Sequence, residues 1–424
     1  MYSNKIDHLT EKTNLLSIQN NELLFAEQKA NELTTKYGSP LYLYFEDIIR
    51  DSCRRLKTTF NHPDFLFNYS VKANSNINVL KIISEEGFGI DAVSLGEIAL
   101  GLKAGIPPNK IFFISNNVSV EEFAFAVKNK VLVVINSLGQ LDLFGRHFTG
   151  ENLAIRINPG FGDGHHKNVI TGGAKTKFGI ELTHIKKIKE IAQRYSLKIC
   201  GLNMHIGSNF MDYRSYVTAS KILLDIADKF KDLSFIDFGG GLGVSYQDGN
   251  KMLDIERMSQ DLHLLCDNFT QKYGKRLHFI MEPGRFLVAE SGILLTTVND
   301  VKRNTSCSFI GTDAGFNVLL RPTLYQAYHE IVNCRNVKGD TMPFNICGNI
   351  CETGDILNKD MPMTYTKISD ILAVLDVGAY GYSMASNYNS RPRPAEVLLQ
   401  KTGRIAQIRK RDTIKNLLEN QIIL

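Results

Sequence analysis

The stretch FLFNYSVKANSNI, residues 65–77, places one lysine, Lys72, directly after an apolar run that is typical of a β-strand. An ammonium group near the end of a buried strand is costly unless it is paired or loses its proton. A structural explanation is that the side chain reaches the surface or pairs with a carboxylate. A functional explanation is that a desolvated lysine forms an imine with a carbonyl compound. The residues at the ends of the neighbouring strands must decide between the two.

Seven further strand-like runs follow, separated by longer segments with helical apolar spacing and by glycines. Between Phe65 and Glu282 the eight runs are FLFNYSV, FGIDAVS, IFFIS, VLVVI, LAIRI, ICGLNMHI, FIDFG and HFIME. Eight strands alternating with helices over roughly 220 residues predict a TIM-like (β/α)₈ barrel, an α/β fold. A doubly wound open sheet is the alternative that the pattern alone leaves open.

The pattern changes after Arg285, where strand-like runs continue and helical spacing becomes scarce. This change predicts a second, β-rich domain at the C-terminal end. The helical N-terminal stretch and PLYLYF, residues 40–45, precede the barrel and are candidates to join the sheet of that domain. We expect an N-terminal segment over residues 1–37 that joins the β domain, a barrel over residues 38–285 and the β domain over residues 286–424.

Composition narrows the class of protein. The 424 residues are 43% hydrophobic, and a net charge of +5 arises from 49 basic and 44 acidic residues without a long like-charge block. This balance disfavours a nucleic-acid or membrane surface. The start of the chain lacks the apolar core of a secretory signal, no run of about 18 apolar residues suggests a membrane span, and seven cysteines fit reduced thiols. We therefore expect a cytoplasmic protein.

Metal binding is not expected. Cys347 and Cys351 stand in CGNIC, but no second pair and no histidine follows at zinc-site spacing. His165 and His166 in GDGHH are interpreted as loop residues rather than metal ligands.

Polar residues occur at the carboxyl ends of six predicted strands, which is where barrel enzymes place their chemistry. They are Lys72, Asp91, Arg156, His205, Glu282 and the glycines of FGGGLG, namely Gly239, Gly240, Gly241 and Gly243. Convergence of six strand ends on one rim is hard to explain by stability alone. These residues are the candidate site.

The glycine run offers backbone amides that can bind a phosphate, although a simple tight turn is the alternative. It fails the dinucleotide fingerprint, because Val244 or Tyr246 stands where a third glycine is needed. The ring of His205 can lie on an aromatic cofactor, and Ser208 can bind phosphate. Glu282 can pair with a protonated ring nitrogen, which would make that ring an electron sink. With an aldehyde-reactive lysine, this set specifies pyridoxal 5′-phosphate.

Motifs in the same order along the chain carry a family resemblance. YSVKAN, DAVSLGE, HIGS, GGGLG, EPGRFLVAESG, DAGFNVLLRPTLYQAYHEI, CETGD and GAYGYSMASNYNSRPRPAEVL resemble the fold-type III pyridoxal-phosphate decarboxylases, in particular bacterial diaminopimelate decarboxylases. The resemblance runs from about Gly38 to the C-terminus. It implies a cofactor-carrying barrel, a Greek-key-like β domain, and a homodimer that shares two active sites.

The resemblance also implies roles for individual residues. Lys72 would bind the cofactor covalently, His205 would stack on its ring and Glu282 would meet the ring nitrogen. Asp91, Glu97 and Arg156 would support the lysine and the ring. The residues implied for the phosphate are Ser208, Gly240, Gly241, Glu282, Pro283, Gly284, Arg285 and Tyr380.

Substrate contacts are implied in the same way. Arg285, Arg321 and Tyr325, with Tyr380 beside them, would bind the distal carboxylate of meso-diaminopimelate, and Glu352 would bind its distal ammonium. Cys351, supplied by the other subunit, would donate a proton, and Tyr388 would line the pocket. A substrate with an amino-acid group at each end requires such charged contacts at its non-reacting end.

Two other functions stay open. One is a decarboxylase of the same fold that acts on ornithine, arginine or a carrier-bound amino acid, for which a partner to a distal carboxylate is unnecessary. The other is a catalytically inactive homologue that binds a regulatory partner, in which the cofactor motifs would be degraded.

Overall fold

The computed structural model describes residues 4–164, 166, 170–173 and 175–424, so His165 lies outside the described residues. Two compact units divide the chain. The β-rich unit comprises Met1–Ser52, Ser245–Asn250 and Leu287–Leu424, and the barrel unit comprises Cys53–Val244 and Lys251–Phe286.

A closed barrel of eight parallel strands forms the centre of the barrel unit. The strands, in spatial order, are β5 (Phe65–Ser70), β6 (Gly89–Ala92), β7 (Ile111–Ile114), β8 (Leu132–Ile135), β9 (Asn152–Asn158), β11 (Lys198–Asn203), β12 (Phe235–Asp237) and β13 (His278–Met281). β13 pairs with β5 and closes the barrel. The predicted barrel is confirmed, and the open-sheet alternative is wrong. β10 (Ile180–Glu181) adds a short parallel pairing to β9.

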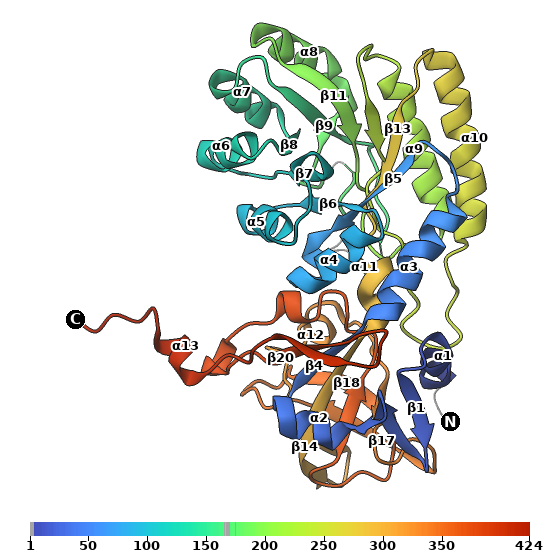
Figure 1. Ribbon diagram of the computed structural model, residues 1–424, viewed down its shortest axis with the longest axis vertical. Coiled ribbons are helices and arrows are strands. Elements are labelled where there is room, and N and C mark those ends of the chain that lie inside the picture. The colour runs from blue at the N-terminus through green and yellow to red at the C-terminus, as the bar shows by residue number, and fades with distance from the viewer. Residues whose placement is uncertain (1–3, 165, 167–169, 174) are drawn as a thin grey trace. The chain divides into compact units, whose positions relative to one another are not determined.

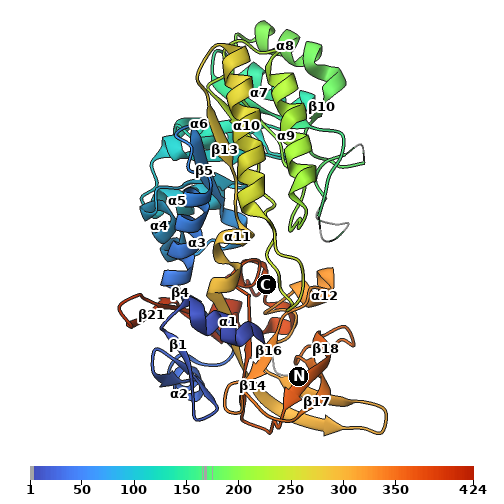
Figure 2. The ribbon, with the colours of Figure 1, turned by 90° about the vertical axis from the view of Figure 1, so that its right-hand side faces the viewer.

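Helices alternate with these strands and cover their outer side (Figure 1). They are α4 (Ile77–Glu85), α5 (Leu95–Lys103), α6 (Val120–Lys128), α7 (Leu138–His147), α8 (Ile185–Arg194), α9 (Tyr213–Ala227) and α10 (Ile255–Tyr273). Figures 1 and 2 both show α9 and α10 side by side. Polar caps begin several of them, as at Ser94, whose hydroxyl accepts the backbone N–H of Glu97. The barrel interior contains Phe112, Ile114, Val134, Ala154, Phe235 and Ile280.

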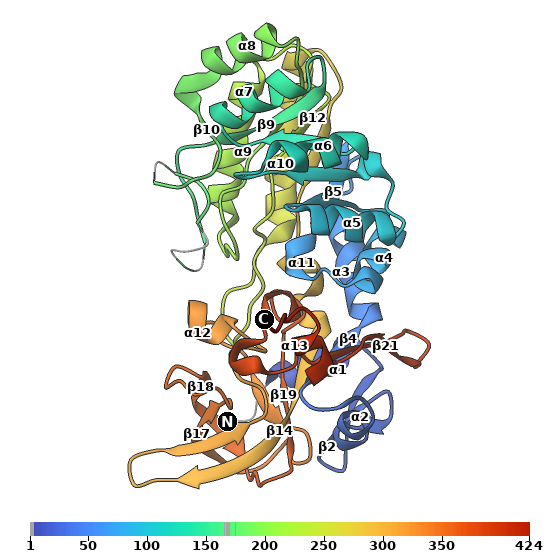
Figure 3. The same cartoon turned by 90° about the vertical axis from the view of Figure 1, so that its left-hand side faces the viewer.

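The β-rich unit is built on one large sheet, parts of which Figure 3 shows. The sheet contains β4 (Leu41–Phe45), β14 (Gly292–Arg303), β15 (Ser308–Thr312), β16 (Ile331–Asn333), β17 (Thr341–Cys347), β18 (Ile356–Thr364), β19 (Ile371–Val374), β20 (Ala395–Leu399) and β21 (Ile405–Arg409). A small sheet of β1 (Leu16–Gln19), β2 (Glu22–Phe25) and β3 (Gln28–Lys29) accompanies it. The helices of this unit are α1 (Asn4–Lys12), α2 (Ala30–Tyr37), α12 (Arg321–Tyr325) and α13 (Ile414–Leu418). The chain changes unit within α3 (Glu46–Thr59) and within α11 (Arg285–Val288).

The chain changes unit later than residue 38, where the barrel was expected to begin. β4 pairs with β14 on one side and with β20 on the other. All five residues of β4 are buried, and a buried strand needs hydrogen-bond partners along both edges. Residues 41–45 therefore belong to the β sheet, and the change of unit falls within α3.

In the part of the chain that the structure describes, no helix combines the length and the apolar composition of a membrane span.

A buried ion pair fixes α1 within the β-rich unit. The Lys5 ammonium lies 2.7 Å from the Asp376 carboxylate, and the two side chains are 8% and 3% exposed. The same ammonium donates a hydrogen bond to the carbonyl oxygen of Ser245. Residues 245–250 return to this unit between two segments of the barrel unit, so Lys5 anchors that return.

Replacing Lys5 with methionine is expected to lower the free energy of unfolding by roughly 3 kcal/mol, because Asp376 is left buried without this partner. The double variant Lys5→Met, Asp376→Asn should lose less, since asparagine carries no charge and tolerates the positive φ of 58° at this position. Urea-induced unfolding followed by circular dichroism measures both changes.

The matched control is Lys338→Met. Lys338 and Asp7 lie 3.5 Å apart with side chains 52% and 43% exposed, so its loss should cost below about 1 kcal/mol. Equal effects of the Lys5 and Lys338 substitutions would contradict the anchoring role.

Candidate active site

Lys72 lies in a short 3₁₀ turn, Val71–Ala73, that follows directly on β5. Its ammonium donates to Asp91 Oδ2 at 3.3 Å, and the Ser70 hydroxyl donates to the same oxygen at 2.8 Å. Asp91 is buried, whereas the Lys72 side chain is 37% exposed. The amine is therefore held by a fixed carboxylate and stays accessible to a small molecule.

Three carboxyl groups share the buried rim of the barrel. Glu282 follows β13 and Asp237 ends β12, with 4% and 0% of their surfaces exposed. Burial, together with the charges of Asp237 and Asp91, raises the pKa of Glu282 well above its ordinary value. Burial also raises the pKa of Asp237 to about 6. A cation placed against Glu282 would restore its charged form.

Neighbouring groups fix these carboxyls in place. The Asn203 side-chain amide donates to Glu282 Oε1 at 3.4 Å. The backbone N–H of Gly239 donates to Asp237 Oδ1 at 2.9 Å.

Arg156, near the end of β9, is a buried cation on the same rim. Its guanidinium lies 4.8 Å from the centre of the Phe178 ring. Burial lowers the pKa of Arg156, although the charge of Glu282 acts in the opposite direction. Within the described residues, Arg156 Nη2 and Asp91 Oδ1 are buried polar atoms without a hydrogen-bond partner. Such atoms are costly, and a bound polar molecule would satisfy them.

His205 is a neutral imidazole. The backbone N–H of Gly240 donates to its Nδ1 at 3.1 Å, so Nδ1 carries no proton. Burial and the positive charges of Lys72 and Arg156 lower the pKa of His205 well below its ordinary value. A neutral ring next to two cations can stack on an aromatic group without adding charge.

The glycine run approaches its neighbours more closely than a side chain permits. A Cβ at Gly240 would lie 1.9 Å from the Glu282 carbonyl oxygen, and one at Gly241 would lie 2.3 Å from that of Gly207. Gly241 also has φ of +110°, which favours glycine. Close to this run, Arg285 Nη2 donates to the Ser208 hydroxyl at 3.1 Å.

The turn from Glu282 to Arg285 packs against the end of β5. The Pro283 carbonyl accepts the backbone N–H of Ser70 at 3.2 Å. A Cβ at Gly284 would lie 3.0 Å from that of Ser70 and 3.2 Å from that of Ala73. Any side chain at position 284 would therefore press on the turn that carries Lys72 and require Ser70 or Ala73 to shift.

The proposed substrate residues other than Arg285 lie in the β-rich unit. Arg321 begins α12 and Tyr325 ends it. Cys351 and Glu352 are exposed in the turn between β17 and β18, and Tyr380 has φ of +57°.

Tyr388 contacts one of these residues directly. Its hydroxyl donates to the Glu352 carboxylate, and its ring stacks on Phe316 with centroids 5.5 Å apart. The backbone N–H of Cys351 donates to Asn389 Oδ1 at 3.2 Å, next to Tyr388.

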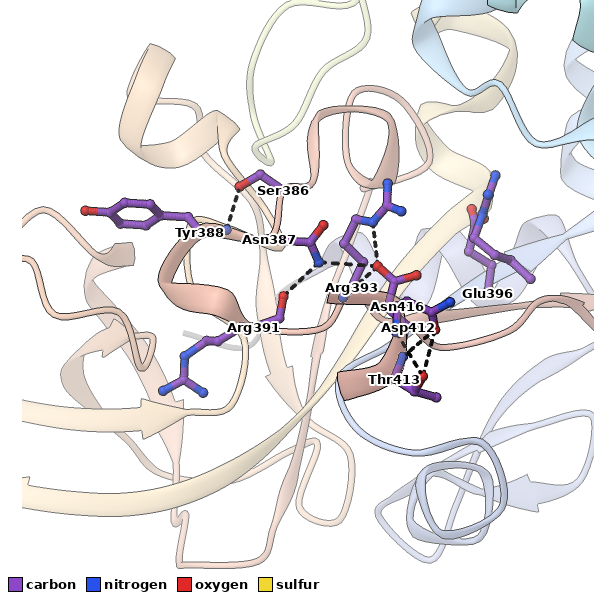
Figure 4. Close-up of polar contacts among 10 residues, drawn as sticks. Ser386, Asn387, Tyr388, Arg391, Arg393, Glu396, Asp412, Thr413 and Asn416 are labelled. Carbon is purple, nitrogen blue, oxygen red and sulfur yellow. Dashed lines mark hydrogen bonds and ion pairs between the residues drawn. The ribbon is translucent and has the colours of Figure 1, made fainter. Parts of the chain in front are cut away.

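The C-terminal segment braces the loop that carries Tyr388 (Figure 4). Asp412 Oδ2 accepts from Arg393 Nε at 2.8 Å and from Asn387 Nδ2 at 3.3 Å. The Asn387 amide also donates to the Arg391 carbonyl at 3.0 Å. Figure 4 shows the Tyr388 ring pointing away from this cluster, so the cluster fixes the loop and leaves the ring free to meet Glu352.

The barrel unit thus brings Lys72, Asp91, Arg156, His205, Ser208, the glycines, Glu282 and Arg285 together at the strand ends. Sequence reasoning missed Ser70, Asn203 and Asp237, which contact Asp91 or Glu282. Asp237 carried a usable signal, because it stands inside an apolar run immediately before FGGGLG. Ser70 and Asn203 carried none.

Glu97, a partly buried residue near this site, makes the stability of the folded protein depend on pH. Burial raises its pKa from the ordinary 4.5 to about 7. The folded state therefore holds this proton more tightly than the unfolded state, and the resulting stability is complete below pH 4.5 and lost as pH rises through about 7. We expect Glu97→Gln, which carries no titrating group, to be more stable than the unsubstituted chain at pH 8 and to fall less between pH 5 and 8.

Urea unfolding at four pH values measures this difference. Glu121→Gln is the control, because Glu121 is exposed and a hydrogen bond from Ser119 lowers its pKa. Identical pH profiles for Glu97→Gln and the unsubstituted chain would contradict the prediction.

Comparison with known proteins supports one family. Residues 46–289 match the family described as pyridoxal-dependent decarboxylase, pyridoxal binding domain. The diaminopimelate decarboxylase of Methanothermobacter thermautotrophicus is 38% identical over 409 residues, which cover 94% of this chain and 95% of that protein.

Solved structures agree over nearly the full length. The diaminopimelate decarboxylase of M. jannaschi has a TM-score of 0.90 at 30% identity, covering 98% of this chain and 99% of the other. The Helicobacter pylori enzyme, complexed with L-lysine, has a TM-score of 0.85 at 34% identity, covering 92% and 98%. With near-complete coverage at these identities, the chain belongs to the diaminopimelate decarboxylase family of pyridoxal-dependent decarboxylases.

Proposed function

We propose that this chain catalyses the pyridoxal 5′-phosphate-dependent decarboxylation of meso-2,6-diaminopimelate to L-lysine and carbon dioxide, the last step of lysine biosynthesis. The observation that carries the proposal is the cluster of Lys72, His205 and Glu282 at the strand ends of one barrel, in a chain of this family. The solved relative that binds L-lysine supports the same product.

The residues present fit this cofactor. Asp91 Oδ1 and Arg156 Nη2 are buried atoms that a polar ligand would satisfy. Gly240 and Gly241 pack too closely on the carbonyl oxygens of Glu282 and Gly207 to carry side chains, so no Cβ would crowd a phosphate bound at this run. Burial and the charges of Asp237 and Asp91 raise the pKa of Glu282, and a protonated ring nitrogen beside it would favour its charged form.

We assign the cofactor contacts accordingly. Lys72 would hold the aldehyde carbon, His205 would lie on the ring and Glu282 would meet the ring nitrogen, with Asp91, Glu97 and Arg156 in support. The residues that would hold the phosphate are Ser208, Gly240, Gly241, the Glu282–Arg285 turn and Tyr380. When bound, pyridoxal 5′-phosphate supplies an electron sink for the pair left by the departing carbon dioxide.

The other residues orient the substrate and deliver a proton. Arg285, Arg321 and Tyr325 bind the distal carboxylate, and Glu352 binds the distal ammonium, so the reacting end is presented to Lys72. Cys351 delivers a proton to the carbon that has lost its carboxylate. Charged contacts at the non-reacting end convert binding energy into orientation at the reacting end.

Carbon dioxide release from four amino acids tests the substrate. The purified protein with pyridoxal phosphate should release carbon dioxide from meso-diaminopimelate and far more slowly from L-ornithine, L-arginine and L-lysine. Lys72→Ala should abolish both the release and the visible absorbance of the bound cofactor. Faster release from ornithine would favour the related decarboxylases, and no release from any of the four would favour an inactive homologue.

We further propose a cytoplasmic homodimer in which each active site combines Lys72 of one subunit with Cys351 of the other. Cys351 is exposed in its own chain, which is consistent with a role in the site of the other subunit. All seven cysteines are free thiols, which is consistent with the cytoplasm.

Subunit mixing tests the shared site. Lys72→Ala and Cys351→Ala dimers should each be nearly inactive. Refolding them together should recover roughly a quarter of the original activity, because half of the dimers then contain one intact site. No recovery, with mixed dimers demonstrated by two affinity tags, would place both residues in the same subunit.

A further inference from the structure

Arg321 is a buried cation in the β-rich unit whose guanidinium contacts two neutral rings. Its surface is 1% exposed. Its Nη1 lies 2.6 Å from Nε2 of His329, and its guanidinium lies 4.3 Å from the centre of the Tyr246 ring. Neither residue has a role in the proposed function.

The contacts of His329 with Leu375 and Arg321 fix its protonation state. Nδ1 lies 2.8 Å from the Leu375 carbonyl oxygen, which only accepts, so Nδ1 carries a proton and donates it. The Arg321 guanidinium only donates, so Nε2 has no proton and accepts. His329, which is 0% exposed, is therefore a neutral acceptor that is fixed by the backbone behind it.

Tyr246 closes a second side of the guanidinium. Its ring is buried beneath Arg321 and meets the His329 ring edge-on, with centroids 5.3 Å apart and planes at 77°. Tyr246 belongs to the returning segment that Lys5 anchors through the Ser245 carbonyl. The three side chains thus come from separate parts of the sequence and restrain one another.

Backbone geometry brings His329 back to Arg321. α12 ends at Tyr325, and the cap residue that follows, Gln326, adopts a left-handed conformation with φ of 53° and ψ of 33°. This residue reverses the chain before β16 begins at Ile331. His329 consequently lies beside the residue that starts the helix, eight positions earlier.

We propose that His329 and Tyr246 are positioning residues that hold the Arg321 guanidinium in one orientation for the carboxylate at the non-reacting end of the substrate. This inference rests on the proposed function. Neither contact cancels the positive charge of the guanidinium, because the imidazole and the phenol ring are both neutral. Paired hydrogen bonds to a carboxylate depend on the plane of the guanidinium, so orientation translates into affinity.

Two substitutions of His329 separate the acceptor from the anchor. Asparagine can keep the hydrogen bond to Leu375 but is too short to reach Arg321, whereas glutamine can place an oxygen near the position of Nε2. We expect His329→Asn to raise KM for meso-diaminopimelate about 10- to 100-fold with kcat changed less than about threefold. His329→Gln should return KM toward the original value.

Product analogues separate the two ends of the ligand. L-lysine retains the distal carboxylate, whereas 1,5-diaminopentane lacks it. His329→Asn should therefore weaken inhibition by L-lysine and leave inhibition by 1,5-diaminopentane nearly unchanged. Equal weakening of both inhibitors would overturn the inference.

A double-mutant cycle tests whether His329 acts through Arg321. In an Arg321→Met background, His329→Asn should have little further effect on KM. If His329 instead only supports the fold, its substitution should raise KM by the same factor in both backgrounds. Tyr246→Leu should raise KM more than Tyr246→Phe, which keeps the ring. If His329→Asn does not fold, the comparison of Tyr246→Leu with Tyr246→Phe tests the inference. Equal effects of these two substitutions on KM would overturn it.

Tyr328→Phe is the matched control, because this neighbouring hydroxyl donates to Glu330 at 2.5 Å. It should leave KM unchanged. If the unsubstituted protein releases no carbon dioxide from diaminopimelate, the proposed function fails and this inference fails with it. If it does release carbon dioxide and His329→Asn keeps the original KM, the inference alone fails.

Discussion

Charge balance among buried groups is the constraint on which the barrel site depends. Glu282, Asp237 and Asp91 are carboxyl groups in a rim from which water is largely excluded, and Arg156 is a cation in the same place. Burial disfavours every one of these charges, so each group needs an opposite charge or a hydrogen bond at a fixed distance. Burial raises the pKa of Glu282, to which the charges of Asp237 and Asp91 add, and burial lowers the pKa of Arg156. A cofactor with a protonated ring nitrogen and a phosphate brings charges of both signs to such a rim.

The closed barrel makes that balance possible. Parallel strands all end at the same rim, so residues from β5, β6, β9, β12 and β13 meet although the sequence separates them widely. The glycine run then lets the backbone approach Glu282 at a distance that no side chain would allow. The same glycine run supplies the N–H that keeps Nδ1 of His205 unprotonated.

The β-rich unit also buries a charged group, and it holds that group through contacts with neutral side chains. Arg321 is buried beside an imidazole acceptor and an aromatic face, and these contacts restrain the guanidinium while its charge persists. A carboxylate in the place of His329 would hold the guanidinium equally well but would compete with an acidic ligand. Polar contacts around Asp412 and around Glu352 restrain the neighbouring loop in the same unit.

Patterns in the sequence were enough to predict the barrel strands and the class of chemistry. Eight apolar runs predicted the eight barrel strands, because a strand that is buried in a barrel leaves a short, continuous run of apolar residues in the sequence. Polar residues at the strand ends and the glycine run indicated the cofactor, because the chemical type of each residue is known directly from the sequence. Tertiary structure alone decided which groups meet. Asp237 and Asn203 lie beside Glu282, and His329 and Tyr246 enclose Arg321. These outcomes depend on strand pairing and on chain reversals between distant segments, and a linear pattern does not encode the distances that decide hydrogen bonds and charge pairs.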